Sequence, residues 1–154
     1  MDEVKLDIVI NASPDAVWTV VSDLERLGEW VTIHRAVERR DDGPIVAGFT
    51  MAQRLELNAN EFVVAWTASE VEEPKLLRWE GEGPAGSRAV TEYRLIAEAG
   101  GTRFRYRNGF DPPGGLLGGA VAGAILGDQP EGEACASLTQ LRELIESALG
   151  RSPT

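Results

Sequence analysis

The sequence of 154 residues contains one cysteine, Cys135, and one histidine, His34. A single cysteine excludes an internal disulfide and favours a reducing, cytoplasmic compartment. A single histidine with one cysteine far along the chain is a weak metal signal, so we expect no metal and no cofactor. Cys135 follows Ala134 on a predicted helix, and we expect it to be a small buried thiol.

Basic residues and long apolar runs are also scarce. Only 15 lysine and arginine residues stand against 25 aspartate and glutamate residues, which gives a formal net charge of −10. This balance argues against a nucleic-acid partner and against charge-driven docking on an anionic membrane. No run reaches the roughly 18 apolar residues of a spanning helix, so we expect no stable membrane insertion. The acidic start, residues 1–3, does not resemble a signal peptide.

What is present is typical of a globular protein. Hydrophobic residues make up 43% of the chain and charged residues 26%, without a break in composition that would mark a linker. A chain of this length can bury a core of its own. We therefore expect a single domain over residues 1–150, with residues 151–154 as a frayed tail.

The first thirty residues carry the clearest local pattern. Residues 4–10 alternate as a strand, and Ser13-Pro14 then predicts the cap and first position of a helix. Apolar residues from Ala16 to Leu24 follow at helical spacing, and Trp30 ends a second short helix.

A series of strands follows, over residues 36–40, 49–57, 62–71, 76–81, 87–97 and 102–110. The last two form a predicted hairpin with Thr91, Tyr93, Leu95, Phe104 and Tyr106 on its dry face. Glu92, Arg94, Arg103, Arg105 and Arg107 take the other face. We interpret this arginine row as part of a solvated sheet face on which opposite charges pair across strands, rather than as a binding surface.

The strongest helix prediction covers residues 131–149. Its apolar face comprises Ala134, Leu138, Leu141, Ile145 and Ala148, and Gly150 is a suitable stop. The glycine-rich run 114–127 before it lacks the features of a phosphate loop. It is interpreted as a movable entrance or as a loose first segment of the helix, and helix and loop both stay open.

A twisted antiparallel sheet bends around its dry face. A helix of this length, about 28 Å, can grip such a sheet without filling the whole space beneath it. The space left over is a predicted pocket for a hydrophobic ligand, with Arg54, Thr67, Thr91 and Asn108 as candidate hydrogen-bonding groups. The residues that we expect to bind the ligand are Trp30, His34, Met51, Phe62, Val64, Trp66, Trp79, Tyr93, Phe104, Tyr106, Phe110, Leu138, Leu141 and Ile145. The parity of the middle strands stays open, because a shift of one residue reverses the two faces.

Residues 8–18, followed by Ser22-Asp23-Leu24 and Trp30, resemble the opening of the SRPBCC superfamily of START-like and pollen-allergen-like proteins. Residues 29–35 and 114–118 are similar to an actinobacterial branch that includes polyketide cyclase/dehydrase-like proteins and one protein labelled as the toxin of a toxin–antitoxin pair. The resemblance implies an α+β helix-grip fold. Its curved antiparallel sheet of six or seven strands wraps around a long C-terminal helix, and two short helices follow the first strand. It also implies a hydrophobic cavity under that helix.

Three functions are compatible with these observations. The leading hypothesis is binding, transport or sequestration of a small hydrophobic molecule such as a lipid, polyketide or aromatic metabolite. The second is a polyketide cyclase/aromatase-like enzyme with His34 as acid–base, since histidine titrates near neutral pH. The third is a toxin-like protein that acts through a protein partner. A homodimer or a small protein partner stays open, and one fold does not determine one reaction.

Overall fold

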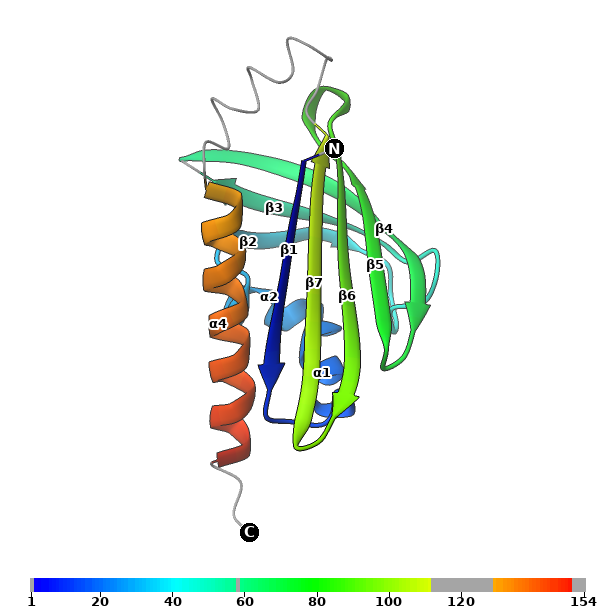
Figure 1. Cartoon of the computed structure of the whole chain (residues 1–154). Coiled ribbons are helices and arrows are strands. Elements are labelled where there is room, and N and C mark those ends of the chain that lie inside the picture. Colours follow the sequence, from blue (N-terminus) through cyan, green and yellow to red (C-terminus); the bar gives the residue numbers. More distant parts are fainter. Residues whose placement is uncertain (1, 58, 112–128, 151–154) are drawn as a thin grey trace.

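The computed structural model describes residues 2–57, 59–111 and 129–150 (Figure 1). The chain begins with strand β1 (Asp2–Ile10), helix α1 (Pro14–Val21), the 3-10 helix η1 (Leu24–Arg26) and helix α2 (Leu27–Trp30). Next come β2 (His34–Arg40), β3 (Thr50–Leu57), β4 (Asn60–Glu72), β5 (Leu76–Glu82), the 3-10 helix η2 (Pro84–Gly86), β6 (Arg88–Glu98) and β7 (Gly101–Asp111). The long helix α4 (Gln129–Gly150) follows.

Seven antiparallel strands form one sheet in the order β1-β7-β6-β5-β4-β3-β2. Figure 1 shows that β2 and β3 run across the direction of β1 and β7, so the sheet curves strongly, while α4 stands beside β1. The short helices α1 and α2 lie within the curve. The predicted helix-grip fold, with its sheet of six or seven strands, is confirmed with seven.

The N-terminal helices begin where the sequence places them. The Ser13 hydroxyl oxygen accepts a hydrogen bond from the Ala16 N–H at 3.2 Å, and Pro14 occupies the first helical position. Asp23 caps η1 by accepting from the Glu25 N–H at 3.0 Å. These caps satisfy amides that have no partner inside the helix, and they fix where α1 and η1 begin.

Helix α4 starts two residues before the predicted helix and ends one residue after it. Two expectations about its faces are wrong. Cys135 is exposed, because the helical rotation from buried Ala134 turns it to the same outer side as exposed Thr139. Ala148 is also exposed, because the helix face that packs in the core ends at Ile145, one turn earlier. The predicted glycine-rich entrance, residues 114–127, and the predicted tail, residues 151–154, lie outside the described residues.

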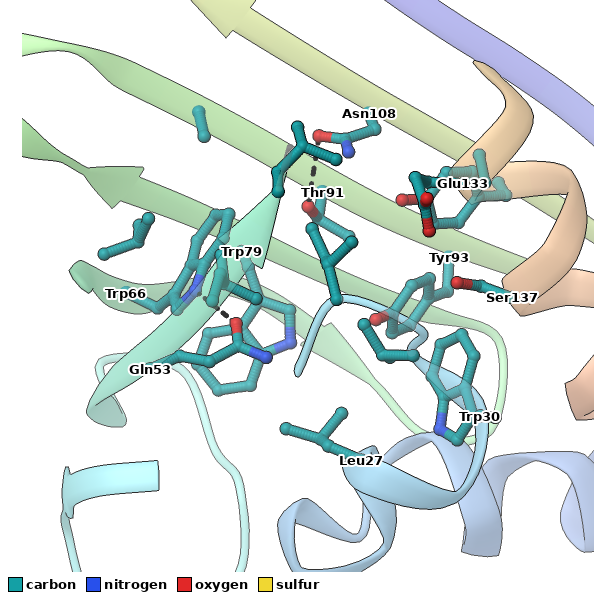
Figure 2. Close-up of a pocket in the computed structure, with 18 of the residues that line it drawn as sticks. Leu27, Trp30, Gln53, Trp66, Trp79, Thr91, Tyr93, Asn108, Glu133 and Ser137 are labelled. Atoms are coloured by element: carbon teal, nitrogen blue, oxygen red, sulfur yellow. Dashed lines mark hydrogen bonds between the residues drawn. The ribbon is translucent and has the colours of Figure 1, made fainter. Parts of the chain in front are cut away.

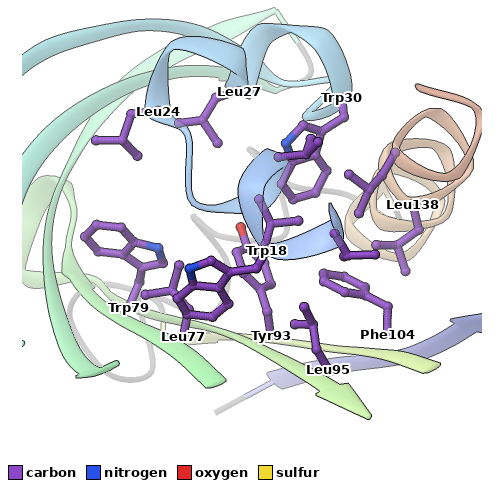
Figure 3. Packing of buried hydrophobic residues seen from close by; sticks show 14 of the residues in the cluster. Trp18, Leu24, Leu27, Trp30, Leu77, Trp79, Tyr93, Leu95, Phe104 and Leu138 are labelled. Atoms are coloured by element: carbon purple, nitrogen blue, oxygen red, sulfur yellow. The ribbon is translucent and has the colours of Figure 1, made fainter. Parts of the chain in front are cut away.

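The middle of α4 packs tightly against the sheet and α1 (Figure 3). Side chains from these three parts form what we term the filled end of the core, a set that comprises Val17, Trp18, Leu77, Leu95, Phe104, Leu138, Leu141 and Ile145. Phe104, Leu77 and Leu141 are completely buried. Burial of one such side chain stabilises the fold by about 1.5–3 kcal/mol, so this end anchors the helix to the sheet.

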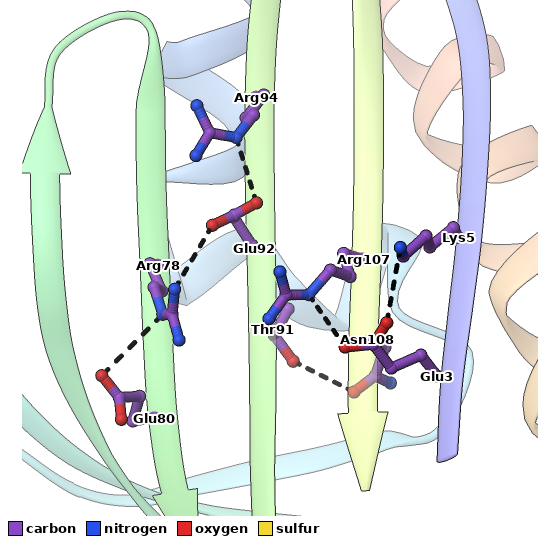
Figure 4. Close-up of polar contacts among 9 residues, drawn as sticks. All are labelled: Glu3, Lys5, Arg78, Glu80, Thr91, Glu92, Arg94, Arg107 and Asn108. Carbon is purple, nitrogen blue, oxygen red and sulfur yellow. Dashed lines mark hydrogen bonds and ion pairs between the residues drawn. The ribbon is translucent and has the colours of Figure 1, made fainter. Parts of the chain in front are cut away.

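The outer face of the sheet carries the predicted arginine row. Glu92 is buried between Arg78, at 3.8 Å, and Arg94, at 3.1 Å (Figure 4). Arg103 likewise lies 3.6 Å from the Asp7 carboxylate on the neighbouring strand β1. These ion pairs agree with the interpretation of a solvated, internally paired face.

Among the helices of the described ranges, none is both long enough and apolar enough to cross a bilayer.

Candidate ligand-binding cavity

A cavity of about 150 Å³ lies between the concave face of the sheet, α2 and the first turns of α4 (Figure 2). Its wall draws on β3 to β7, on the short helices and the segment after them, and on α4. Most of the wall is apolar or aromatic, with a few polar groups spread along it. This combination is typical of small-molecule sites, in which apolar contacts hold a ligand and sparse polar groups orient it.

The cavity brings together most of the side chains predicted to bind a ligand. Those on its wall are Trp30, Met51, Phe62, Val64, Trp66, Trp79, Tyr93, Tyr106 and Phe110. The parity that the sequence left open is now clear, because alternate residues of β3 and β4 face inward, among them Met51 and Trp66. Their contact with a ligand stays a prediction.

The other predicted residues do not lie on the wall. Phe104, Leu138, Leu141 and Ile145 are part of the filled end, where their side chains are buried in the core cluster. The cavity lies nearer the start of the helix, where α4 contributes Glu133, Ala134 and Ser137. His34 is also absent from the wall, although it contacts a residue that belongs to it.

Of the four polar candidates for hydrogen bonding, two line the cavity. Thr91 and Asn108 lie there, with the Thr91 hydroxyl 3.4 Å from the Asn108 side-chain oxygen. Arg54 and Thr67 do not, because they have the opposite parity on their strands. Arg54 instead pairs with Glu38 on the neighbouring strand at 2.9 Å.

Several wall residues were missed by the sequence analysis: Val21, Leu24, Leu27, Val31, Ile33, Gln53, Leu55, Leu57, Ala89, Glu133, Ala134 and Ser137. Two signals were available. The period of two that starts at Met51 leads through Gln53 to Leu57. Glu133 and Ser137 stand four residues apart at the start of an otherwise apolar helix face, a spacing that makes them neighbours.

Trp66 forms part of the cavity floor because a glycine lies opposite it. Gly81 pairs with Trp66 across β4 and β5. A Cβ atom at Gly81 would stand 2.6 Å from Trp66 Cε3 and 2.6 Å from Val64 Cγ1, which is closer than atoms can approach. The indole ring therefore occupies the space that a side chain would take, and the glycine fixes how the ring lies.

The Trp66 indole starts a chain of hydrogen bonds that ends at His34. Its Nε1–H donates to Gln53 Oε1 at 2.9 Å, and Gln53 Nε2 lies 2.9 Å from His34 Nδ1. An indole N–H is only a donor, so Gln53 must turn its oxygen to Trp66 and its NH₂ group to His34. His34 Nδ1 then accepts, which requires a neutral ring. Burial, and to a lesser degree the nearby Arg35 charge, lowers the pKa of His34 and favours that neutral form.

Hydrogen bonds from Thr32 connect the segment after α2 to helix α4. The Thr32 N–H donates to Ser137 Oγ at 3.1 Å, and the Thr32 hydroxyl donates to the Glu133 carboxylate. Glu133 and Ser137 both line the cavity. These contacts hold the start of the helix over the cavity without filling it.

Aromatic rings form the side of the cavity nearest β6 and β7. Tyr93 stacks on Tyr106 at 6.1 Å between ring centres and meets the edge of Trp30 at 5.8 Å. Burial raises the pKa of Tyr106 to about 12 and raises the pKa of Tyr93 as well. Both phenols are therefore neutral near pH 7, and neither is a phenolate base.

The described residues contain no group of three or more His, Cys, Asp or Glu side chains placed to hold a metal ion. What the arrangement can do is enclose an apolar molecule and contact its polar atoms at a small number of positions.

Comparisons with known proteins agree with this architecture. The uncharacterized protein MT1597 of Mycobacterium tuberculosis is 27% identical over 151 residues, which covers 94% of this chain and 99% of the relative. The crystal structure of the Zhui aromatase/cyclase from a Streptomyces species superposes with a TM-score of 0.77 at 16% identity, over 96% of this chain and 95% of that one. The protein TTHA0849 from Thermus thermophilus gives a TM-score of 0.75 at 19% identity, over 96% and 99% of the two chains.

The two structural matches show the fold alone, and the mycobacterial relative fits the predicted actinobacterial resemblance. The resemblance to a toxin of a toxin–antitoxin pair is not confirmed. A family profile matches residues 1–146, which is nearly the whole chain. The chain therefore belongs to the family described as polyketide cyclase/dehydrase and lipid transport.

Proposed function

We propose that the protein binds a small hydrophobic molecule in this cavity, for transport or sequestration. The observation that carries the proposal is the cavity itself, enclosed by aromatic and aliphatic side chains between α2, α4 and the sheet. The description of the family, which includes lipid transport, supports the same function.

Apolar contact alone is a sufficient source of affinity for such a ligand. Burial contributes about 25 cal/mol per Å² of apolar surface removed from water, so about 300 Å² contributes roughly 7 kcal/mol before the cost of association. Rings that are already fixed in place, such as Trp66 against Gly81, lower the part of that cost that comes from ordering the protein.

The test compares tryptophans inside and outside the cavity, with the neutral dye N-phenyl-1-naphthylamine as probe. Trp79→Leu and Trp66→Leu remove wall area, and we expect dye affinity to fall roughly tenfold, equivalent to about 1.4 kcal/mol. Trp18→Leu is the matched control, because Trp18 is buried in the filled end and does not reach the cavity. Its dye affinity should stay within about twofold.

Far-UV circular dichroism would establish that each variant is folded. Equal dye affinity in all three variants would overturn the proposed cavity site, as would a loss in Trp18→Leu alone.

A second candidate function is cyclisation of a polyketide, and Glu133 is the observation that favours it. Its half-buried carboxylate stands on the wall of a mostly apolar cavity, where an acid or base could transfer a proton to or from a ligand. Native mass spectrometry of the purified protein distinguishes the functions. A bound molecule that is recovered chemically unchanged supports binding alone, whereas loss of water on incubation supports cyclisation followed by dehydration. A co-purifying protein would support the partner hypothesis.

A further inference from the structure

We propose that Gln53 selects the ligand by offering an amide N–H to a carbonyl oxygen, and that Trp66 and His34 hold the amide in that orientation. The inference rests on the proposed function and adds the chemistry that the cavity recognises. Gln53 is then a specificity-determining residue, whereas His34 is a positioning residue that acts through it.

The orientation of the amide follows from the hydrogen-bond chain. Trp66 donates to Gln53 Oε1 at 2.9 Å, as Figure 2 shows, and this uses the side of the amide that can accept. The amide cannot flip without placing its NH₂ group against the Trp66 N–H, a donor against a donor. His34 Nδ1, at 2.9 Å from Gln53 Nε2, takes one of the two N–H groups.

The second N–H of Gln53 is what remains for a ligand. Gln53 lines the cavity and is 6% exposed, and among the described residues no acceptor partners this second N–H. Trp30, also on the wall and 1% exposed, likewise has an indole N–H without a hydrogen-bond partner among those residues. A buried donor that stays unpaired destabilises the state in which it is buried. A ligand that brings an acceptor oxygen removes that penalty.

The unpaired N–H of Gln53 favours a ligand with a carbonyl oxygen over a hydrocarbon of the same shape. An aromatic ketone or quinone presents a flat apolar ring for the rings of the wall and a carbonyl oxygen that only accepts. A hydrocarbon of the same shape fills the same space and leaves the Gln53 N–H unpaired. The cavity therefore discriminates by the presence of an acceptor in addition to apolar area.

Protonation of His34 would break the arrangement, because a protonated ring donates from both nitrogens and cannot accept from Gln53. Among the described residues, burial lowers the pKa of His34 most, and Arg35 is the charged group that lowers it further. Arg35 is adjacent and pairs with Glu56 on β3 at 3.1 Å, and α2 approaches the ring at Gly28, which is followed by Glu29. Acidification below the usual pKa range of histidine is therefore expected to release the amide.

The experiment uses two probes of matched shape, 1-indanone and indane, each displacing N-phenyl-1-naphthylamine from the full chain. In the wild type near pH 7.5 we expect the ketone to bind roughly three- to tenfold more tightly, the range of one hydrogen bond. The measured quantity is the ratio of the 1-indanone affinity to the indane affinity within one variant. Because both probes displace the same dye, a change in dye affinity does not alter this ratio.

Two substitutions of Gln53 remove the N–H in different ways. Gln53→Leu removes the whole amide, while Gln53→Glu keeps an oxygen acceptor for Trp66 and replaces the NH₂ donor by a carboxylate oxygen. In both, the preference for the ketone should fall to about one or below. Retention of the wild-type preference in either folded variant would overturn the proposal.

His34→Asn tests the positioning role, because asparagine Oδ1, attached to Cγ as histidine Nδ1 is, can accept at nearly the same place. This variant should keep the ketone preference at about pH 7.5 and at about pH 5, whereas the wild type should lose it at the lower pH. A wild-type preference that does not change with pH overturns the role of His34. Equal binding of both probes by the wild type overturns the inference alone, and failure of both to bind overturns the proposed function with it.

Discussion

Helix α4 borders two different regions of the core. From Leu138 onward it packs in the filled end, whereas Glu133, Ala134 and Ser137 border the cavity, a region that we term the hollow end. At the filled end, Leu138 and Leu141 reach the sheet and enclose Phe104. One turn earlier, the inward positions are held by Ala134 and Ser137, whose short side chains leave the cavity open. A change in side-chain size along one face of the helix therefore accompanies the change from the filled end to the cavity.

At the hollow end, hydrogen bonds hold α4 in place, whereas at the filled end apolar contacts hold it. Thr32 bonds to both Ser137 and Glu133, so the start of α4 has a fixed position above the cavity. A helix without such contacts would gain by closing onto the sheet, because empty space removes attractive contacts on one side of its lining. The comparison therefore predicts different responses to the same substitution at the two ends.

The largest effect is expected from truncation of a leucine. Leu141→Ala, at the filled end, should lower the free energy of unfolding by about 4 kcal/mol, since dense surroundings relax little around the gap. Leu55→Ala, on the cavity wall, should cost about 2 kcal/mol, since that side chain already lacks neighbours on one side. Both residues are at least 94% buried, so exposure does not explain the difference.

Urea denaturation of the two variants measures this difference. Equal costs, or a larger cost for Leu55→Ala, would mean that the cavity wall is as densely packed as the filled end.

A second prediction converts the hollow end into a filled one. Ala134→Leu places at the start of α4 the side chain that Leu138 has one turn later. We expect at least a tenfold loss of N-phenyl-1-naphthylamine affinity and a gain in stability of about 1 kcal/mol from filled space. Ala136→Leu is the control, because Ala136 is exposed on the same helix and should leave dye binding unchanged. Dye affinity that survives in Ala134→Leu would place the bound probe elsewhere.

Much of the fold was predictable because it depends on local rules. Ser13 caps α1, the hairpin between β6 and β7 places Leu95 against Phe104, and Leu138 belongs to a helical apolar face. Each of these follows from spacing within a short segment. For the same reason, the observed ends of the strands and helices differ from the predicted ends by only a few residues.

The position of the cavity along α4 was not predictable from such rules. Leu141 and Trp79 are equally apolar in the sequence, yet one lies in the filled end and the other on the cavity wall. The difference depends on which side chains of other elements lie opposite each residue, and these come from distant parts of the sequence. Gln53 was missed because a polar residue in a strand predicts an outward side chain, unless its partners Trp66 and His34 are already known.

The smallest effect concerns the hydrogen bond that keeps the hollow end open. Ser137→Ala leaves the Thr32 N–H without its acceptor, and we expect a loss of about 1 kcal/mol in the free energy of unfolding. Ser147→Ala is the matched control, since Ser147 is exposed at the other end of the same helix and alanine is the better helix former. Its stability should stay equal or rise slightly. Because Ser137 also borders the cavity, its variant should weaken dye binding a few-fold if the bond to Thr32 sets the height of the helix, whereas unchanged binding would assign that role to Glu133 alone.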